Sequence, residues 1–413
     1  MSELREGLDK VLEKYVTDGP VPGAVALVAR GDQVDVRAAG FADVEGTSPV
    51  ARDSIFRIAS ISKPITAAAV MLLVEDGRIA LDDPVATWLP ELASPKVVRT
   101  TSSPVDDVVP AVRPITVADL LSFRAGYGFP ADFSLPALAP LFNDLRQGPP
   151  QPQLVAPPDE WMATLARIPL LHQPGEAWLY NTASDIQGVL IARVAGRPLP
   201  EFLAERIFEP LGMTDTGFAV PAEKLDRFVS YYRHGPAGDA AGGAGGGEGG
   251  GTGGGGLELV DAPDGQWSRL PAFPSGAGGL VSTVDDWLAF GRMLLGGGGT
   301  AGGSAGGTTA GRRLLSEESV RLMTTDHLTR AEREAGALFL EGQGWGYGGS
   351  VDIEPIDPWN VRGRYGWVGG TGTTAHVVPS TGTVTVLLSQ VAMTGPTPPD
   401  LMRDFWRCAA TSD

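Results

Sequence analysis

The sequence predicts an α+β fold in which an antiparallel sheet is built from both ends of the chain and is flanked by helices. Segments with the residue pattern of strands occur near the N-terminus and again near the C-terminus. Between them, residues 84–220 read as helical pieces separated by proline-rich loops. This order predicts a sheet domain from residues 1–58 and 260–413, with a mostly helical domain, residues 59–234, inserted between its two parts.

The first elements are expected to be a helix and a strand hairpin. Residues 1–16 place apolar side chains at helical spacing. Residues 25–29 and 34–38 are rich in β-branched and small apolar residues, and a turn with glycine and aspartate at positions 31–32 separates them. The two segments therefore predict adjacent antiparallel strands.

A second helix is expected to begin near Ser60, which stands where an N-cap residue belongs. Pro64 falls in the first turn of this helix, where a missing N–H costs little. Gly77 is the expected C′ residue that ends it. One face of the helix is apolar and should pack into the core; it consists of Ile65, Ala68, Ala69, Leu72 and Leu73.

The C-terminal part predicts the remaining half of the sheet. Residues 278–290 read as a strand end that runs into a helix, with Ser282 or Thr283 as the cap. Two alternating segments and a closing helical segment follow, at residues 373–378, 383–391 and 397–410.

Two glycine-rich stretches interrupt this order. Residues 235–256 cannot bury enough apolar surface to offset the entropy lost on ordering, so we expect a disordered insertion, and residues 296–311 should be a shorter loop of the same kind. The second stretch contains a Gly-x-Ser-x-Gly match around Ser304. That pattern needs a strand before it and a helix after it, and neither is predicted here.

Composition excludes several classes of protein. The net charge of −17 argues against a nucleic-acid or anionic-membrane partner, because both require a positive surface. The chain has one cysteine, Cys408, and four histidines without metal-ligand spacing, so neither a disulfide nor a metal or other cofactor is expected. No signal-peptide core and no long apolar run are found, which predicts a cytoplasmic protein without a membrane span. The oligomeric state is not indicated.

The predicted second helix carries a serine and a lysine three residues apart, Ser60 and Lys63. Free serine is a poor nucleophile and needs an adjacent base. On a helix this spacing brings the two side chains together on one face. A helix N-terminus disfavours an ammonium ion, which favours the neutral, basic form of the lysine. The helical domain therefore carries a candidate nucleophile and base.

The surroundings of this pair resemble a known family. "IFRIASISKPITAAAVMLLVEDGRIALDDPV" is similar to the active-site helix of the serine beta-lactamase-related superfamily, which includes class C beta-lactamases, penicillin-binding proteins and beta-lactamase-like carboxylesterases and acyltransferases. Similar segments follow in the family's order: "ITVADLLSFRAGYG", "QPGEAWLYNTASDIQGVLIARVAGRPL", "LGMTDTGF", "GAGGLVSTVDDWLAFGRMLL" and "YGWVGGTGTTAHVVPSTGTVTVLLSQ". The resemblance covers most of residues 20–391 and implies a beta-lactamase-like fold.

The resemblance implies roles for individual residues. Ser60 matches the acylated nucleophile, and Lys63 matches its base partner. Tyr180 matches the tyrosine of a Tyr-x-Asn motif, which relays the proton to the leaving group in a shared-proton pair with Lys63. The backbone N–H of Gly370 is implied to form an oxyanion hole with that of Ser60.

The chain departs from the family at its second motif. The third position of Tyr-x-Asn is Thr182, and an asparagine, Asn181, stands beside it. Either side chain could hydrogen-bond the substrate or Lys63, so both are candidate substrate-binding residues. Tyr127, shortly after the segment 120–126, is a candidate second tyrosine of the pocket.

The final motif departs as well. The family often has Lys-Thr-Gly or His-x-Gly, whereas residues 367–369 here read Trp-Val-Gly. Trp367 and Gly369 are therefore candidate substrate-binding residues without a cation. A tryptophan suits an apolar acyl or alcohol group better than a carboxylate, and this substitution resembles the carboxylesterase branch.

These observations predict a serine hydrolase that acts through an acyl-enzyme, as a carboxylesterase or acyltransferase on small esters. A beta-lactamase or a D-amino-acid peptidase or amidase is the alternative within enzymes. A catalytically silent, penicillin-recognising binding protein is a second alternative, and the intact set of Ser60, Lys63 and Tyr180 argues against it.

Overall fold

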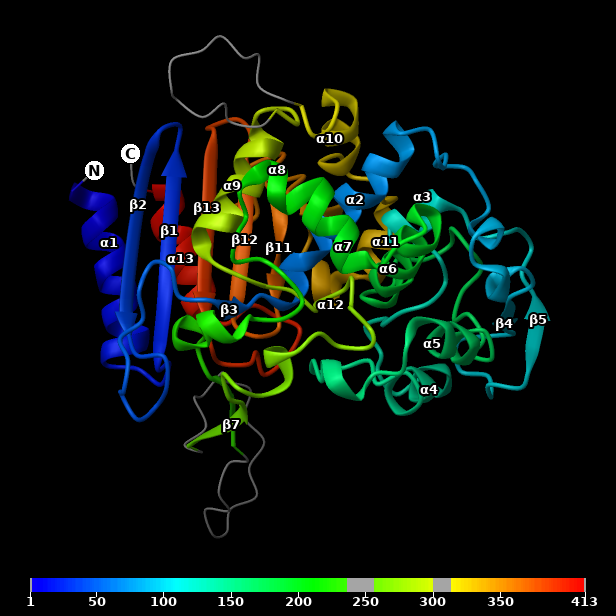
Figure 1. The fold of residues 1–413 in the computed structure, drawn as a ribbon. Coiled ribbons are helices and arrows are strands. Elements are labelled where there is room, and N and C mark those ends of the chain that lie inside the picture. The colour runs from blue at the N-terminus through cyan, green and yellow to red at the C-terminus, as the bar shows by residue number, and fades with distance from the viewer. Residues whose placement is uncertain (1, 236–255, 300–312, 412–413) are drawn as a thin grey trace, which may run out of the picture.

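The computed structural model describes residues 2–235, 256–299 and 313–411. Its main sheet has seven strands, and every neighbouring pair is antiparallel. The strands are β1 (Gly23–Arg30), β2 (Gln33–Gly40), β9 (Gly344–Trp345), β10 (Ser350–Val351), β11 (Tyr365–Gly369), β12 (Thr373–Val378) and β13 (Thr383–Ser389). Their order across the sheet is β2-β1-β13-β12-β11-β10-β9 (Figure 1).

The two ends of the chain meet in the middle of this sheet. β1 pairs with β13 from Ala24 opposite Ser389 to Arg30 opposite Thr383. Seven of the eight residues of β1 are buried, so both faces of the strand are covered. The predicted α+β class and the sheet built from both chain ends are therefore confirmed.

Helices cover both faces of the sheet. The terminal helices α1 (Ser2–Leu12) and α13 (Asp400–Thr411) pack against each other and against the sheet on one side, where Trp406 bonds Thr374. On the other side α9 (Val284–Leu295) packs against β1, β12 and β13, with Gly291 against Val384 (Figure 1). Helices from both ends of the chain thus contribute to one core. An apolar strand inside a sheet needs such cover on both of its faces.

The helical part lies beside the far end of the sheet (Figure 1). At its centre is α2 (Lys63–Glu75), whose residues from Lys63 to Leu73 are all buried, and it packs against α6 (Thr182–Ala195). The other helices are α3 (Val117–Leu121), α4 (Ala139–Asn143), α5 (Pro158–Leu165), α7 (Leu199–Leu203), α8 (Glu209–Leu211), α10 (Glu317–Met323), α11 (Arg330–Ala335) and α12 (Ala337–Leu340). No helix within the described ranges is long and apolar enough to cross a membrane.

Of four residues that were expected to mark the start or end of a helix, three do so and one does not. Thr283 caps α9 by accepting from the backbone N–H of Asp286, and Gly77, at φ = 67°, follows the end of α2. Pro64 lies in the first turn of α2. Ser60 does not cap this helix: it lies inside a 3₁₀ turn, Ala59–Ser62, that precedes α2. The 3₁₀ turn moves the N-cap position of the α-helix from Ser60 to Ser62, two residues along the chain.

Three two-stranded sheets complete the fold: β3 (Phe56–Arg57) with β8 (Val281–Ser282), β4 (Lys96–Val98) with β5 (Val108–Pro110), and β6 (Tyr231–His234) with β7 (Leu257–Asp261). The β6–β7 pair flanks the predicted glycine-rich insertion, of which residues 236–255 lie outside the described residues. Most of the second stretch, from residue 300 to 311, lies outside them as well. The proposed division into two domains remains a prediction.

Candidate active site

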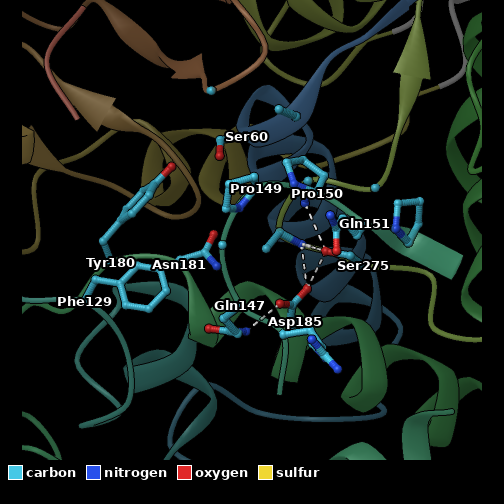
Figure 2. A pocket seen from close by; sticks show the side chains of 18 of the residues that line it. Ser60, Phe129, Gln147, Pro149, Pro150, Gln151, Tyr180, Asn181, Asp185 and Ser275 are labelled. Carbon is cyan, nitrogen blue, oxygen red and sulfur yellow. Dashed lines mark hydrogen bonds between the residues drawn. The ribbon is translucent and has the colours of Figure 1, made fainter. Parts of the chain in front are cut away.

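A cavity of about 410 Å³ opens where the 3₁₀ turn before α2, the end of β11 and the loop before α6 meet. Ser60 lies on its wall and is half-buried. Figure 2 shows Tyr180 and Phe129 on one side of the space, Pro149 and Pro150 on the other, and Ser60 above them. The lining is largely apolar, and Arg146 and Asp185 are the charged side chains among the described residues that line it.

The backbone before Ser60 is held in an unusual conformation. Ala59 has φ = 44°, in the left-handed region, which costs a non-glycine residue about 1 kcal/mol or more. β11 passes close behind this turn, and a Cβ on Gly369 would lie 2.5 Å from the carbonyl oxygen of Ile58. Gly369 is therefore buried behind the serine, because only glycine lets the strand approach, and it is not among the lining residues. Its predicted substrate contact is wrong.

Lys63 lies directly behind Ser60 and is fully buried. Its Nζ donates to three oxygens: Ser60 Oγ at 2.9 Å, Asn181 Oδ1 at 2.9 Å and the carbonyl of Ala277 at 2.6 Å. Burial lowers the pKa of Lys63 to about 7, and the charge of Asp185 opposes that fall. The main cause is thus loss of solvent, whereas the sequence pointed to a helix N-terminus. Near neutral pH this amine can lose its proton and accept one from Ser60.

Tyr180 faces the serine from the loop before α6. Burial raises the pKa of its hydroxyl to about 12, and the neighbouring Ser60 and Trp367 side chains oppose that rise. The Nε1–H of Trp367 donates to this hydroxyl at 2.7 Å. Lys63 Nζ lies 4.8 Å from the centre of the Tyr180 ring, and its hydrogen bonds go elsewhere. The expected shared-proton pair therefore takes a different form, in which Ser60 stands between the amine and the phenol.

The structure separates the roles of Asn181 and Thr182. Asn181 has φ = 82° and ψ = −68°, the centre of a γ-turn in which the N–H of Thr182 bonds the carbonyl of Tyr180 at 3.2 Å. This strained turn aims Asn181 at Lys63. Thr182 is fully buried as the first residue of α6, and its hydroxyl donates to Gln147. Thr182 is therefore not a pocket residue, and Asn181 is the partner of the lysine.

Tyr127 also lies away from the cavity. It is 2% exposed, and its hydroxyl bonds the backbone carbonyl oxygen of Ile168 at 3.2 Å. Its polar atom is thus used to join two backbone segments inside the helical part. The prediction that Tyr127 contacts the substrate is wrong, because a local motif does not indicate which way a loop tyrosine turns.

Gly370 lies at the end of β11 and lines the cavity together with Ser60. Its carbonyl accepts from the N–H of Met393 at 2.9 Å, while its own N–H meets no acceptor in the described part of the chain. The same holds for the N–H of Ser60. Two N–H groups at the wall of a cavity suit a developing oxyanion. The oxyanion hole itself remains a prediction.

Trp367 forms part of the wall and is 3% exposed. Since its one polar atom bonds Tyr180, it offers the cavity an apolar ring. Other aromatic residues that sequence reasoning missed extend this wall; those that line the cavity are Phe129, Phe133, Phe142 and Phe339 on the Tyr180 side and Trp161, Tyr231, Trp267 and Phe273 elsewhere. Single aromatic residues in separate helices and loops give no local signal of a shared pocket.

Sequence reasoning also missed a buried polar group at the cavity wall. Asp185 in the first turn of α6 accepts hydrogen bonds from Ser275 and Gln147 (Figure 2). An acidic residue five positions after Tyr180 was the available signal, but in the first turn of a helix such a residue is also explained by the helix dipole. Across the described ranges, no group of three or more His, Cys, Asp or Glu side chains could hold a metal ion.

Replacing Tyr180 with phenylalanine should lower kcat/KM for an ester of an aliphatic alcohol by about 10²-fold or more, because an alkoxide is a poor leaving group and the variant lacks the hydroxyl predicted to protonate it. The ring packing against Phe339, at 4.8 Å between ring centres, is kept. Tyr127→Phe is the matched control: it removes a buried hydroxyl far from the cavity and should change the melting temperature more than the rate. Parent-like activity of Tyr180→Phe would contradict the assigned role.

Comparisons with known proteins identify the family of the chain. The protein-family model described as Beta-lactamase matches residues 8–404. Protein Rv1367c of Mycobacterium tuberculosis is 35% identical over 395 residues, covering 93% of this chain and 90% of its own. Esterase EstB of Burkholderia gladioli is 32% identical over 286 residues, or 69% of this chain and 68% of EstB. The solved structure titled EstCE1, a hydrolase with promiscuous acyltransferase activity, has a TM-score of 0.76 at 25% identity and covers 100% of this chain and 99% of that one.

Proposed function

Because the chain belongs to the beta-lactamase family, we propose that it is a serine hydrolase in which Ser60 forms an acyl-enzyme with a small carboxylic ester. One observation carries the proposal: the amine of Lys63 is fully buried and lies 2.9 Å from Ser60 Oγ. Burial keeps the pKa of this amine near 7. A serine with a neutral amine in hydrogen-bond contact has the base that nucleophilic attack requires.

The reaction begins when Ser60 Oγ bonds to the ester carbonyl carbon and its proton passes to Lys63 Nζ. The carbonyl oxygen becomes negative and lies toward the N–H groups of Ser60 and Gly370. Collapse of this intermediate breaks the bond to the alcohol, and Tyr180 supplies the proton that the alcohol needs. Lys63 then gives up the proton that it took from Ser60, and this proton restores the Tyr180 hydroxyl, so both groups return to their starting states.

The acyl group is then transferred from Ser60 to a second nucleophile. Water gives the carboxylic acid, whereas an alcohol or amine gives a new ester or amide, with the same groups moving protons in reverse. EstB is an esterase by name, and EstCE1 is described as a hydrolase with acyltransferase activity. The proposed activity of this chain is therefore ester hydrolysis, with acyl transfer where an acceptor reaches the cavity.

The wall of the cavity favours apolar substrates. Trp367 stands where carboxylate-binding relatives place a cation, and its N–H is already bonded to Tyr180. An unpaired carboxylate against an indole ring is disfavoured. The net charge of −17 also favours neutral small molecules over anionic ones. A beta-lactamase or D-amino-acid peptidase activity is the alternative that this reasoning ranks second.

Substrate preference is tested by measuring kcat/KM separately for an ester and for a beta-lactam. We expect kcat/KM for a short-chain p-nitrophenyl ester to exceed that for benzylpenicillin by at least roughly 100-fold, a difference of about 2.7 kcal/mol in transition-state stabilisation. A chromogenic cephalosporin serves as the third substrate, because its reactive lactam reports weak lactamase activity. Efficient benzylpenicillin hydrolysis with slower ester hydrolysis would reverse the order of the two functions.

A further inference from the structure

A buried carboxylate, that of Asp185, lies at the wall of the cavity where three chain segments meet. Asp185 Oδ1 accepts from Ser275 Oγ at 2.6 Å and from the N–H of Ala277 at 3.1 Å. Its Oδ2 accepts from Gln147 Nε2 at 2.8 Å. Figure 2 shows these contacts converging from α6, from the turn at residues 275–278 and from the loop that carries Gln147. Three donors from two segments, the turn at residues 275–278 and the loop of Gln147, hold the carboxylate in one position.

One peptide unit joins this carboxylate to the amine behind Ser60. The N–H of Ala277 donates to Asp185, and the carbonyl of the same residue accepts from Lys63 Nζ at 2.6 Å. Anything that moves the Asp185 carboxylate therefore moves an oxygen that holds Lys63. Asp185 does not touch the Ser60 hydroxyl, so its influence on the nucleophile must pass through the amine.

The turn at residues 275–278 is held in place by α2 on one side and by α6 on the other. The hydroxyl of Thr66 on α2 donates to the carbonyl of Gly276 at 2.8 Å. A Cβ on Gly276 would collide with the carbonyl oxygen of Ser184 on α6, so the turn needs glycine to lie this close. Thr66 thus fixes the same turn as Asp185 without contacting the carboxylate, which makes it a natural control.

Asp185 also interacts electrostatically with Lys63. The titratable and charged side chains around the cavity are Asp185, Arg146, Tyr180 and Tyr231. Of these, Asp185 is the one whose charge acts on the amine. Burial lowers the pKa of Lys63 to about 7 and raises the pKa of Asp185, and the attraction between the two charges opposes both shifts.

We propose that Asp185 is a positioning residue for Lys63: through Ser275 and the Ala277 peptide it holds the amine against Ser60, and its negative charge stabilises the protonated amine that forms when Ser60 attacks. The proposal rests on the acyl-enzyme mechanism given above. It concerns a residue that meets neither the substrate carbonyl nor the nucleophile in the structure.

The test is the pH profile of Asp185→Asn. Asparagine has the same shape, and Gln147 can turn its amide so that its oxygen accepts from the new NH₂ group; the Gln147 NH₂ then donates to the Thr182 hydroxyl, which donates to Gln147 in the parent. In the parent, kcat/KM for a p-nitrophenyl ester should rise with pH and level off above about 7, as Lys63 loses its proton. Without the negative charge the protonated amine is less stable, so the rise should move to lower pH by roughly one unit. The plateau should fall, because the amine is a weaker base.

Thr66→Val separates charge from geometry. It removes the hydrogen bond to Gly276 from the opposite side of the turn and leaves the carboxylate unchanged. We expect a lower plateau with the rise at the parental pH. If the pH profile of kcat/KM shifts equally in Thr66→Val, the effect comes from the geometry of the turn. If the profile of Asp185→Asn does not shift, Asp185 has a structural role alone. Either result overturns the proposal.

Two further outcomes are distinguishable. Near-ultraviolet circular dichroism shows whether Asp185→Asn folds. If it does not, the same shift of the pH profile is expected for Asp185→Ser. If neither variant folds, the carboxylate is required for folding, which overturns the proposal. If the parent neither turns over esters nor is labelled at Ser60 by a phosphonate, the acyl-enzyme mechanism itself fails. An active, labelled parent with an unmoved Asp185→Asn profile rejects the Asp185 proposal alone.

Discussion

Ser60→Ala should lower kcat/KM for a p-nitrophenyl ester by about 10³-fold or more and should abolish covalent labelling by a phosphonate probe. The reason is that, among the described residues, Ser60 Oγ is the hydroxyl at the cavity wall that lies 2.9 Å from Lys63 Nζ. Some activity over the uncatalysed rate should survive, because binding and oxyanion stabilisation can persist without the nucleophile. Removal of one hydroxyl from a half-buried site leaves the packing unchanged, so the variant should fold.

Ser62→Ala is the matched control for that experiment. Ser62 lies in the same 3₁₀ turn, but it is fully buried and its hydroxyl donates to the carbonyl of Ala59 at 2.6 Å. It should keep phosphonate labelling at Ser60 and most of the activity. Mass spectrometry of the labelled peptide identifies the reactive residue. Labelling that persists in Ser60→Ala, or that maps to Ser304, would contradict the assignment of the nucleophile.

Lys63→Met should reduce kcat/KM by about 10²- to 10⁴-fold, the usual contribution of a positioned base. Methionine has nearly the length of lysine and suits a fully buried site, but it has no lone pair that can take the proton of Ser60. In the parent the rate should fall as the pH drops below about 7, because a proton then occupies the amine; the ordinary value of this pKa is 10.5, and burial is the main cause of the change.

Lys63→Arg distinguishes a base from a positive charge. Arginine keeps the charge but stays protonated at any pH used for the assay. It should therefore be as slow as Lys63→Met in ester turnover, provided that circular dichroism shows both variants folded. Substantial activity in Lys63→Arg would mean that the cation, rather than its loss of a proton, supports the reaction.

Features within one turn or one strand were predictable because they depend on neighbours in the chain. The three-residue spacing brings Ser60 and Lys63 within 2.9 Å, although a 3₁₀ turn rather than a helix cap holds the serine. The Thr283 cap and the glycine after α2 follow from backbone preferences of single residues. The order of strands and helices along the chain predicted the α+β class, and the resemblance of sequence motifs indicated the family; both are confirmed.

The contacts that distinguish similar residues were not predictable in this way. Asn181 and Thr182 are adjacent and both polar, yet a γ-turn directs one to Lys63 and the first turn of α6 buries the other. Tyr127 and Tyr180 are both aromatic residues in loops before helical segments, and only the packed fold shows that one bonds backbone carbonyls while the other faces Ser60. Direction of a side chain depends on packing, which residue type alone does not specify.

By itself, then, the sequence determined which elements form, in what order, and which serine and lysine share a turn, because these depend on short-range spacing and on the apolar pattern of each segment. The tertiary structure decided how basic that lysine is and what holds it. Its surroundings combine Asn181, Ala277 and, through one peptide, Asp185, which lie far from Lys63 along the chain. These groups meet because α2 packs against α6 and the turn at residues 275–278 closes over both helices, and the resulting loss of solvent brings the pKa of Lys63 to about 7.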